Sequence, residues 1–159
     1  MIVPGAPKGK PGEVGRRRPA QARIAYAIGR LERIVRQRLA EVTRRFGLTV
    51  AQYTALSVLH ARGRLSNAQL ARRSFVTPQA MNEIVTAMAA AGIVAQRPHA
   101  LHGRIVEISL TGKGERTLAR CDAAVQRVEG SMLAGLAQRE RRRLRALLWA
   151  CIEGLEGGH

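Results

Sequence analysis

The positions at which helices can begin restrict the fold of this chain more than any other feature of its sequence. Residues 49–52 and 66–69 each match a capping box, in which a hydroxyl and the amide three positions later bond to each other's backbone N–H groups. A third start is predicted at Thr77, because Pro78 follows it and proline is favoured at the first helical position. Gly92 favours the end of this last helix. The sequence therefore predicts helices over residues 49–61, 66–73 and 77–91, the last two joined by a tight turn.

Longer helices are predicted on both sides of this segment. Over residues 24–46 apolar side chains recur every three or four positions, which is the spacing of an amphipathic helix, and Gly47 ends it. A fifth helix is predicted to begin at Thr111, with an apolar stripe over residues 118–136. A sixth carries a similar stripe over residues 144–155.

Two strands are predicted between the fourth and fifth helices. Residues 93–97 and 104–110 are rich in Ile and Val, and in the second run Val106, Ile108 and Leu110 alternate onto one face. Residues 98–103 would form the hairpin tip. The predicted fold class is mainly α with a small β-hairpin.

The charge of the chain indicates a polyanionic partner. It has 27 Lys and Arg against 11 Asp and Glu, a net charge of +16, which is more than solubility requires. Residues 1–20 alternate proline and glycine with basic side chains and lack apolar periodicity, so they are predicted to be a flexible basic arm. The sequence contains no apolar run of spanning length and no signal region, so we expect a soluble, cytoplasmic protein with no membrane partner.

Aromatic residues are too few for binding of single strands. Two Phe, two Tyr and one Trp are present, whereas single-stranded nucleic acid is usually held by stacking on clustered rings. Duplex DNA is therefore the expected partner. Basic charge alone would also suit a non-specific architectural protein that coats DNA or RNA, and a protein-interaction module is a third alternative.

The cysteines, the histidines and the search for catalytic motifs do not indicate a function other than binding of a polyanion. Cys121 and Cys151 are too few for a disulfide framework, and both lie on apolar stripes, where cysteine normally packs as a small buried side chain. His99 and His102 have no carboxylate or cysteine near them at ligand spacing, so no metal site is expected. The sequence has no phosphate-binding glycine loop and no nucleophile elbow, so we expect a protein that is not an enzyme and needs no cofactor.

From about residue 22 to 156 the order of elements resembles the multiple-antibiotic-resistance regulator (MarR) family of winged helix-turn-helix proteins. The residues that carry the resemblance are Leu70 and Ala71, the run 76–81 with Met88, the run 92–94, Arg97, Arg104 and the run 110–114. The resemblance implies a transcription regulator that is an obligate two-fold dimer. It implies one domain over residues 21–157, with a DNA-binding lobe at about 49–111 and dimerisation helices at about 21–46 and 112–156.

Two positions depart from the pattern of the family. The wing of the family commonly has an acidic residue two positions before its arginine, where this chain has His102. The recognition helix often has an arginine where this chain has Glu83, which would repel phosphates or accept a bond from a cytosine amino group. An operator sequence cannot be transferred from relatives.

The candidate DNA-binding residues lie on the helix from Thr77, on the hairpin and at nearby helix ends. If Met81, Ile84, Val85 and Met88 face the core, the other face can meet a groove, with amide side chains for adenine and small side chains for thymine methyl groups. Arg104 is expected to enter the minor groove, and the helix-end arginines to contact phosphates. The full set is Thr77, Pro78, Gln79, Ala80, Asn82, Glu83, Thr86, Arg97, Arg104, Arg62, Arg64, Arg72 and Arg73.

A small effector is implied by the resemblance rather than by the residues. Members of the family are released from DNA when a small aromatic or phenolic ligand enters the cleft between the dimerisation helices and the lobe. The side chains placed to line such a cleft are Tyr26, Phe46, Tyr53 and His60, although ordinary packing explains them equally well.

Overall fold

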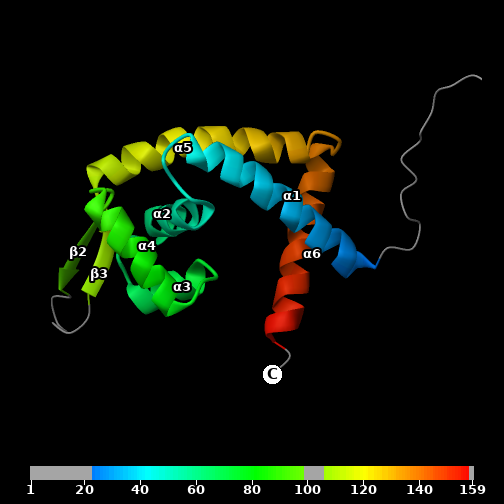
Figure 1. Cartoon of the computed structure of the whole chain (residues 1–159). Coiled ribbons are helices and arrows are strands. Elements are labelled where there is room, and N and C mark those ends of the chain that lie inside the picture. The colour runs from blue at the N-terminus through cyan, green and yellow to red at the C-terminus, as the bar shows by residue number, and fades with distance from the viewer. Residues whose placement is uncertain (1–22, 99–105, 158–159) are drawn as a thin grey trace, which may run out of the picture.

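The computed structural model describes residues 23–98 and 106–157, which form helices and one small sheet (Figure 1). In chain order the elements are α1 (Ile24–Arg44), α2 (Val50–Arg62), β1 (Leu65–Ser66), α3 (Asn67–Arg73), α4 (Pro78–Ala90), β2 (Val94–Pro98), β3 (Val106–Leu110), α5 (Gly112–Met132) and α6 (Gln138–Glu156). The predicted fold class is confirmed. The predicted arm over residues 1–20 lies outside the described residues, as does residue 104 at the start of the second predicted strand.

The predicted helix starts are confirmed at the level of individual hydrogen bonds. Thr49 Oγ1 accepts from the Gln52 N–H at 3.1 Å, and the Gln52 amide oxygen accepts from the Thr49 N–H at 2.9 Å. The same reciprocal pair closes the start of α3. Thr77 Oγ1 accepts from the Ala80 N–H at 3.2 Å, and Pro78 occupies the first turn of α4. Each cap joins residues only three positions apart, so the sequence of that short segment is enough to predict it.

A compact lobe is built from α2, α3, α4, the sheet and the first half of α5 (Figure 1). Its core includes Leu56, Leu70, Met81, Met88 and Ile108, all less than 3 % exposed. On α4 the apolar face is directed inward as predicted, with Met81, Val85 and Met88 buried and Ile84 partly buried.

The sheet has three strands rather than the two predicted. Its order is β1-β3-β2, with both pairs antiparallel. In β1, Leu65 pairs with Ile108 and its side chain is buried in the core. Two residues are too short a run to show a strand periodicity, and they extend only because β3 supplies hydrogen-bonding partners.

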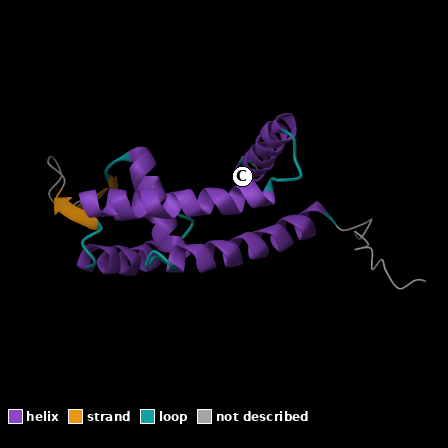
Figure 2. Ribbon diagram, turned by 90° about the horizontal axis from the view of Figure 1, so that it is seen from above, coloured by secondary structure: helices purple, strands orange, loops and turns teal. Residues whose placement is uncertain are grey.

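The long helices form a separate layer beside the lobe. Helices α1 and α5 lie side by side and antiparallel, which Figures 1 and 2 show from two directions. Helix α1 ends at Arg44 rather than at residue 46, since Phe46 lies in a turn that Gly47 closes with a φ of 72°. Helix α6 projects away from the other elements (Figure 2), and none of its residues, all of them described, is buried.

The two cysteines differ in environment. Cys121 is buried in the lobe core, as expected, and this burial and the neighbouring Asp122 carboxylate both raise the pKa of its thiol. The expectation of burial is wrong for Cys151, which is exposed on α6. Within the described structure, no residue of the apolar stripe that contains Cys151 is buried.

Candidate DNA-binding surface

The exposed face of α4 presents a row of polar and small side chains. Gln79, Asn82, Glu83 and Thr86 are exposed and Ala80 is partly buried, on the side of the helix opposite the buried Met81, Val85 and Met88. The Thr86 hydroxyl donates to the Asn82 carbonyl at 2.8 Å, so it is directed along its own helix. The Asn82 amide has no hydrogen-bonding partner among the described residues and is free to bond to a base edge.

Side chains from distant parts of the chain hold both ends of α4. Asn67 Nδ2, at the start of α3, donates to the Pro78 carbonyl at 2.9 Å. At the other end Lys113 Nζ donates to the Ala91 carbonyl at 2.8 Å, and the Thr111 hydroxyl donates to the Gly92 carbonyl at 2.7 Å. A cation close to the last carbonyls also stabilises the helix dipole. Sequence reasoning missed Asn67 and Lys113 in this role, because a contact between helices leaves no periodic signal.

The four helix-end arginines are all exposed but do not form one cluster. Arg64 lies 3.9 Å from a carboxylate oxygen of Glu107 on β3. Arg62, at the end of α2, and Arg73, at the end of α3, line a common groove with the turn between α3 and α4. Arg72 is not among the residues that line that groove.

The wing is described only in part. Arg97 is exposed on β2, and in the strand register it stands opposite Glu107 on β3. Arg104, His99 and His102 lie outside the described residues. The minor-groove role of Arg104 therefore stays a prediction.

The four side chains predicted to line an effector cleft are not brought together. Tyr26 is 60 % exposed near the start of α1 and lines neither the groove that His60 lines nor the groove that Tyr53 lines. Phe46 packs against the lobe core, with the Arg120 guanidinium 6.0 Å above its ring. His60 Nδ1 lies 2.9 Å from Glu115 Oε2, on a groove between α2 and α5 that differs from the groove lined by Tyr53.

Tyr53 links α2 to α5. Its hydroxyl donates to Asp122 Oδ1 at 2.6 Å. Burial, and then this bond to a carboxylate, raise the pKa of the phenol well above its ordinary value. Tyr53 is therefore a neutral donor to Asp122 at physiological pH.

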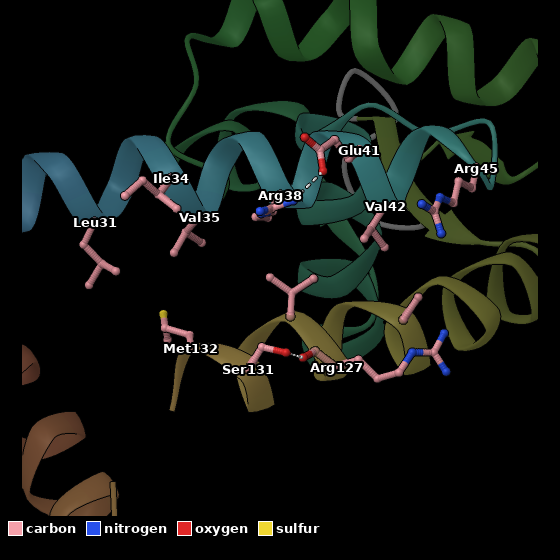
Figure 3. A pocket seen from close by; sticks show the side chains of 12 residues that line it. Leu31, Ile34, Val35, Arg38, Glu41, Val42, Arg45, Arg127, Ser131 and Met132 are labelled. Atoms are coloured by element: carbon pink, nitrogen blue, oxygen red, sulfur yellow. Dashed lines mark hydrogen bonds and ion pairs between the residues drawn. The ribbon is translucent and has the colours of Figure 1, made fainter. Parts of the chain in front are cut away.

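A further groove lies between α1 and α5 (Figure 3). It has a volume of about 680 Å³ and a mixed lining, with apolar side chains from α1 (Leu31, Ile34, Val35) and α5 (Val128, Met132) beside charged ones such as Arg38, Glu41 and Arg127. Further apolar side chains are exposed along α6, among them Leu148, Ile152 and Leu155. Contiguous apolar surface of this kind marks an interface in soluble proteins.

The described residues were also compared with what a metal site or a membrane-spanning helix requires. Within residues 23–98 and 106–157, no three His, Cys, Asp or Glu side chains are grouped so as to hold a metal ion. Among these same residues, no helix is long and apolar enough to cross a bilayer.

The lobe formed by α2, α3, α4 and a short antiparallel sheet, in which the outer face of α4 is polar, defines the winged helix-turn-helix class of transcription regulators. The family model described as MarR family matches residues 46–105. The HTH-type transcriptional repressor Rv2887 of Mycobacterium tuberculosis is 31% identical over 127 residues, which cover 80% of this chain and 91% of the relative. The chain belongs to the MarR family.

Solved structures of relatives agree with this assignment. The structure of Rv2887 in complex with DNA matches with a TM-score of 0.70 and 30% identity, over 82% of this chain and 98% of that one. The same protein in complex with salicylic acid matches with a TM-score of 0.68 and 30% identity, over 83% and 98% of the two chains.

Proposed function

We propose that this chain acts as a homodimer that recognises a near-palindromic duplex operator, represses transcription and leaves the operator when a small aromatic ligand binds. The lobe at about residues 49–111 would read DNA, the helices at about 21–46 and 112–156 would form the dimer, and residues 1–20 would add affinity. This function is not enzymatic, and we infer that it is carried out in the cytoplasm.

The observation that carries the proposal is the two-sided character of α4. One face is buried in the core and holds the helix rigidly, while the opposite face presents amide and small side chains of the kind that distinguish bases in the major groove. The net charge of +16 supplies the attraction to phosphates. The names of the relatives, a transcriptional repressor and its complexes with DNA and salicylic acid, support the same function.

The experiment is selection of bound duplexes from a random pool by the purified protein, followed by competition with random DNA. A regulator should enrich a near-palindrome and prefer it to random duplex by roughly a thousandfold or more. A non-specific architectural protein, the alternative that the high charge favours, would enrich nothing. That outcome would overturn the proposal.

Asn82→Ala is expected to weaken binding to the selected operator by about 1–3 kcal/mol and to relax the preference at one base pair in each half-site. The reason is that the variant removes an exposed amide that contacts a base edge and not a phosphate. Binding to random duplex and the salt dependence should stay close to those of the parent. Gln138→Ala is the matched control, because it removes an exposed amide from the start of α6, distant from α4 (Figure 1).

Arg104→Ala should behave in the opposite way, because an arginine in the minor groove acts mainly through charge. We expect weaker operator binding and a salt dependence reduced by about one unit of slope per wing, with the greatest loss where the flanks are A·T-rich. Titrations of both variants at several salt concentrations separate the two roles. Two results would contradict this assignment. One is an Asn82→Ala variant that loses the same affinity for every duplex. The other is an Arg104→Ala variant that binds the operator with the affinity of the parent.

A further inference from the structure

The single tryptophan of the chain lies on α6, away from the apolar stripe of that helix. Trp149 is 58 % exposed, on a helix that projects away from the other elements (Figure 2). The middle of the apolar stripe follows Leu144, Leu148, Cys151 and Leu155, and Trp149 is turned roughly 130° around the helix axis from it. A single exposed ring is common on protein surfaces, so its meaning depends on the side chains around it.

Charged side chains flank Trp149 in a symmetric pattern. Arg142 and Arg145 precede it by seven and four positions, and Glu153 and Glu156 follow it by four and seven positions. Spacings of three and four place all five residues, the Trp149 stripe, along one side of α6. The stripe is therefore basic on one side of the ring and acidic on the other, at equal distances.

These charges are not used within the described chain. Among residues 23–98 and 106–157, none of the four charged side chains of the Trp149 stripe forms an ion pair. The shortest separation between an arginine and a glutamate on the stripe is from Arg145 to Glu153, which exceeds the three or four positions at which helix side chains pair. Carboxylates in the last turn also oppose the helix dipole, and the last turn of α6 has no basic residue. The pattern therefore does not stabilise α6 itself.

A second copy of the Trp149 stripe is complementary to the first. If two α6 helices lie antiparallel about a two-fold axis at Trp149, each residue faces the residue equally far from Trp149 on the other side. Arg142 of one copy then lies opposite Glu156 of the other. In the same way Arg145 lies opposite Glu153, and the two indole rings meet at the axis. A parallel arrangement would instead place like charges together.

We propose that two dimers associate into a tetramer by antiparallel pairing of the Trp149 stripes, with one α6 helix supplied by each dimer. The apolar stripe of α6 points in another direction and stays available for the dimer itself. Exposed ion pairs contribute little each, so this contact should be weaker than the dimer contact and sensitive to salt. The inference goes beyond the proposed function, because a tetramer carries two DNA-binding surfaces and can occupy two operators together.

The test measures the mass of the full chain without DNA by sedimentation, from about 1 µM to about 500 µM. At low salt we expect the parent to change from dimer to tetramer within this range, and at about 1 M salt we expect the tetramer to be lost. The emission of Trp149 should shift to shorter wavelength with the same concentration dependence, because no other tryptophan contributes and the ring leaves water. If no species larger than a dimer forms at low salt, a second copy is not the occupant and the proposal is overturned.

Charge exchange tests the antiparallel pairing. An acidic-stripe variant has Arg142→Glu with Arg145→Glu, and a basic-stripe variant has Glu153→Arg with Glu156→Arg. Each should form a tetramer at least about tenfold more weakly than the parent, because like charges then face each other. A mixture of the two should recover the association. The variant with all four substitutions keeps the net charge of the parent, restores the complementary pattern and should associate like the parent.

Two further variants separate the stripe from general charge and from the dimer. Trp149→Ala is expected to weaken the tetramer about tenfold or more while the dimer is retained. The control for the acidic-stripe variant is Arg139→Glu with Arg143→Glu, which makes the same change of charge on α6 outside the stripe and should leave the tetramer intact.

The remaining outcomes are distinguishable. If the variant with four substitutions is as defective as the acidic-stripe and basic-stripe variants, the antiparallel pairing is wrong. If either of those two variants is a monomer, the Trp149 stripe belongs to the dimer interface and the proposal is overturned. Operator selection is independent of this contact, since the stripe lies outside the lobe. A parent chain that forms the tetramer but selects no operator would therefore support this inference and contradict the proposed function.

Discussion

A variant in which Leu148 and Ile152 are both replaced by glutamate is expected to sediment as a monomer at concentrations where the parent chain is a dimer. These side chains lie four residues apart on one face of α6, a helix without a buried residue in the described structure. Burial of a leucine or isoleucine stabilises an interface by roughly 1.5–3 kcal/mol. Loss of two such contacts on each protomer should raise the dissociation constant of the dimer by a factor of about one hundred or more.

The control for this variant is Ala146→Glu, which adds a carboxylate on the opposite side of α6 and should leave the dimer intact. The lobe core contains neither Leu148 nor Ile152, so the far-ultraviolet circular dichroism of the lobe helices should be retained. The monomer should bind one half-site and lose most of its affinity for the full operator. A Leu148→Glu, Ile152→Glu protein that remains a dimer at micromolar concentration would show that α6 does not form the interface.

The Gly114→Ala substitution is expected to be strongly destabilising although it adds a single methyl group. A Cβ at this position would overlap the Ile93 carbonyl oxygen and lie 3.1 Å from the Ile93 carbonyl carbon, and both are backbone atoms that cannot rotate away. The same carbonyl accepts from the Thr111 N–H at 3.2 Å, so the start of α5 is held against the end of α4. We expect a loss of about 3 kcal/mol, at the upper end of overpacking costs.

For a chain of this length that loss corresponds to a fall in the melting temperature of roughly 6–12 °C. Gly130→Ala is the matched control, since it lies on the same helix with nothing within 4 Å of its added Cβ. Alanine is favoured over glycine inside a helix, so this control should be slightly more stable than the parent. Both melts need one fixed protein concentration, because dimerisation contributes to stability. Equal melting temperatures for the two variants would contradict the close approach of α5 to Ile93.

Local features of the candidate site could be predicted from the sequence. Two of these features depend only on hydrogen bonds and spacings within a few residues, so the amino-acid sequence alone predicts them. They are the helix caps at Thr49, Ser66 and Thr77 and the buried face of α4. The exposure of Gln79 and Asn82 follows once the apolar face is known.

The groove lined by Tyr53, Arg62, Arg73 and Phe75 could not be predicted in the same way. The sequence does not predict a positive φ at Phe75, because this conformation is set by the turn between the packed helices α3 and α4. The bond from Tyr53 to Asp122 joins residues 69 positions apart. The apolar stripe that includes Cys151 is visible in the sequence, but its exposure along α6 in the described structure is a property of the fold.

The sequence by itself determined where helices begin, which of their faces are apolar, and that a polyanion is the partner, because hydrogen-bonded caps, side-chain periodicity and net charge are properties of short segments or of composition. The tertiary structure alone decided that Arg62, Arg73 and Phe75 share one groove, that β1 pairs with β3, and that a backbone carbonyl leaves no room for a Cβ at Gly114. These outcomes depend on the distances at which helices and strands pack, and those distances arise from all the side chains of the core acting together.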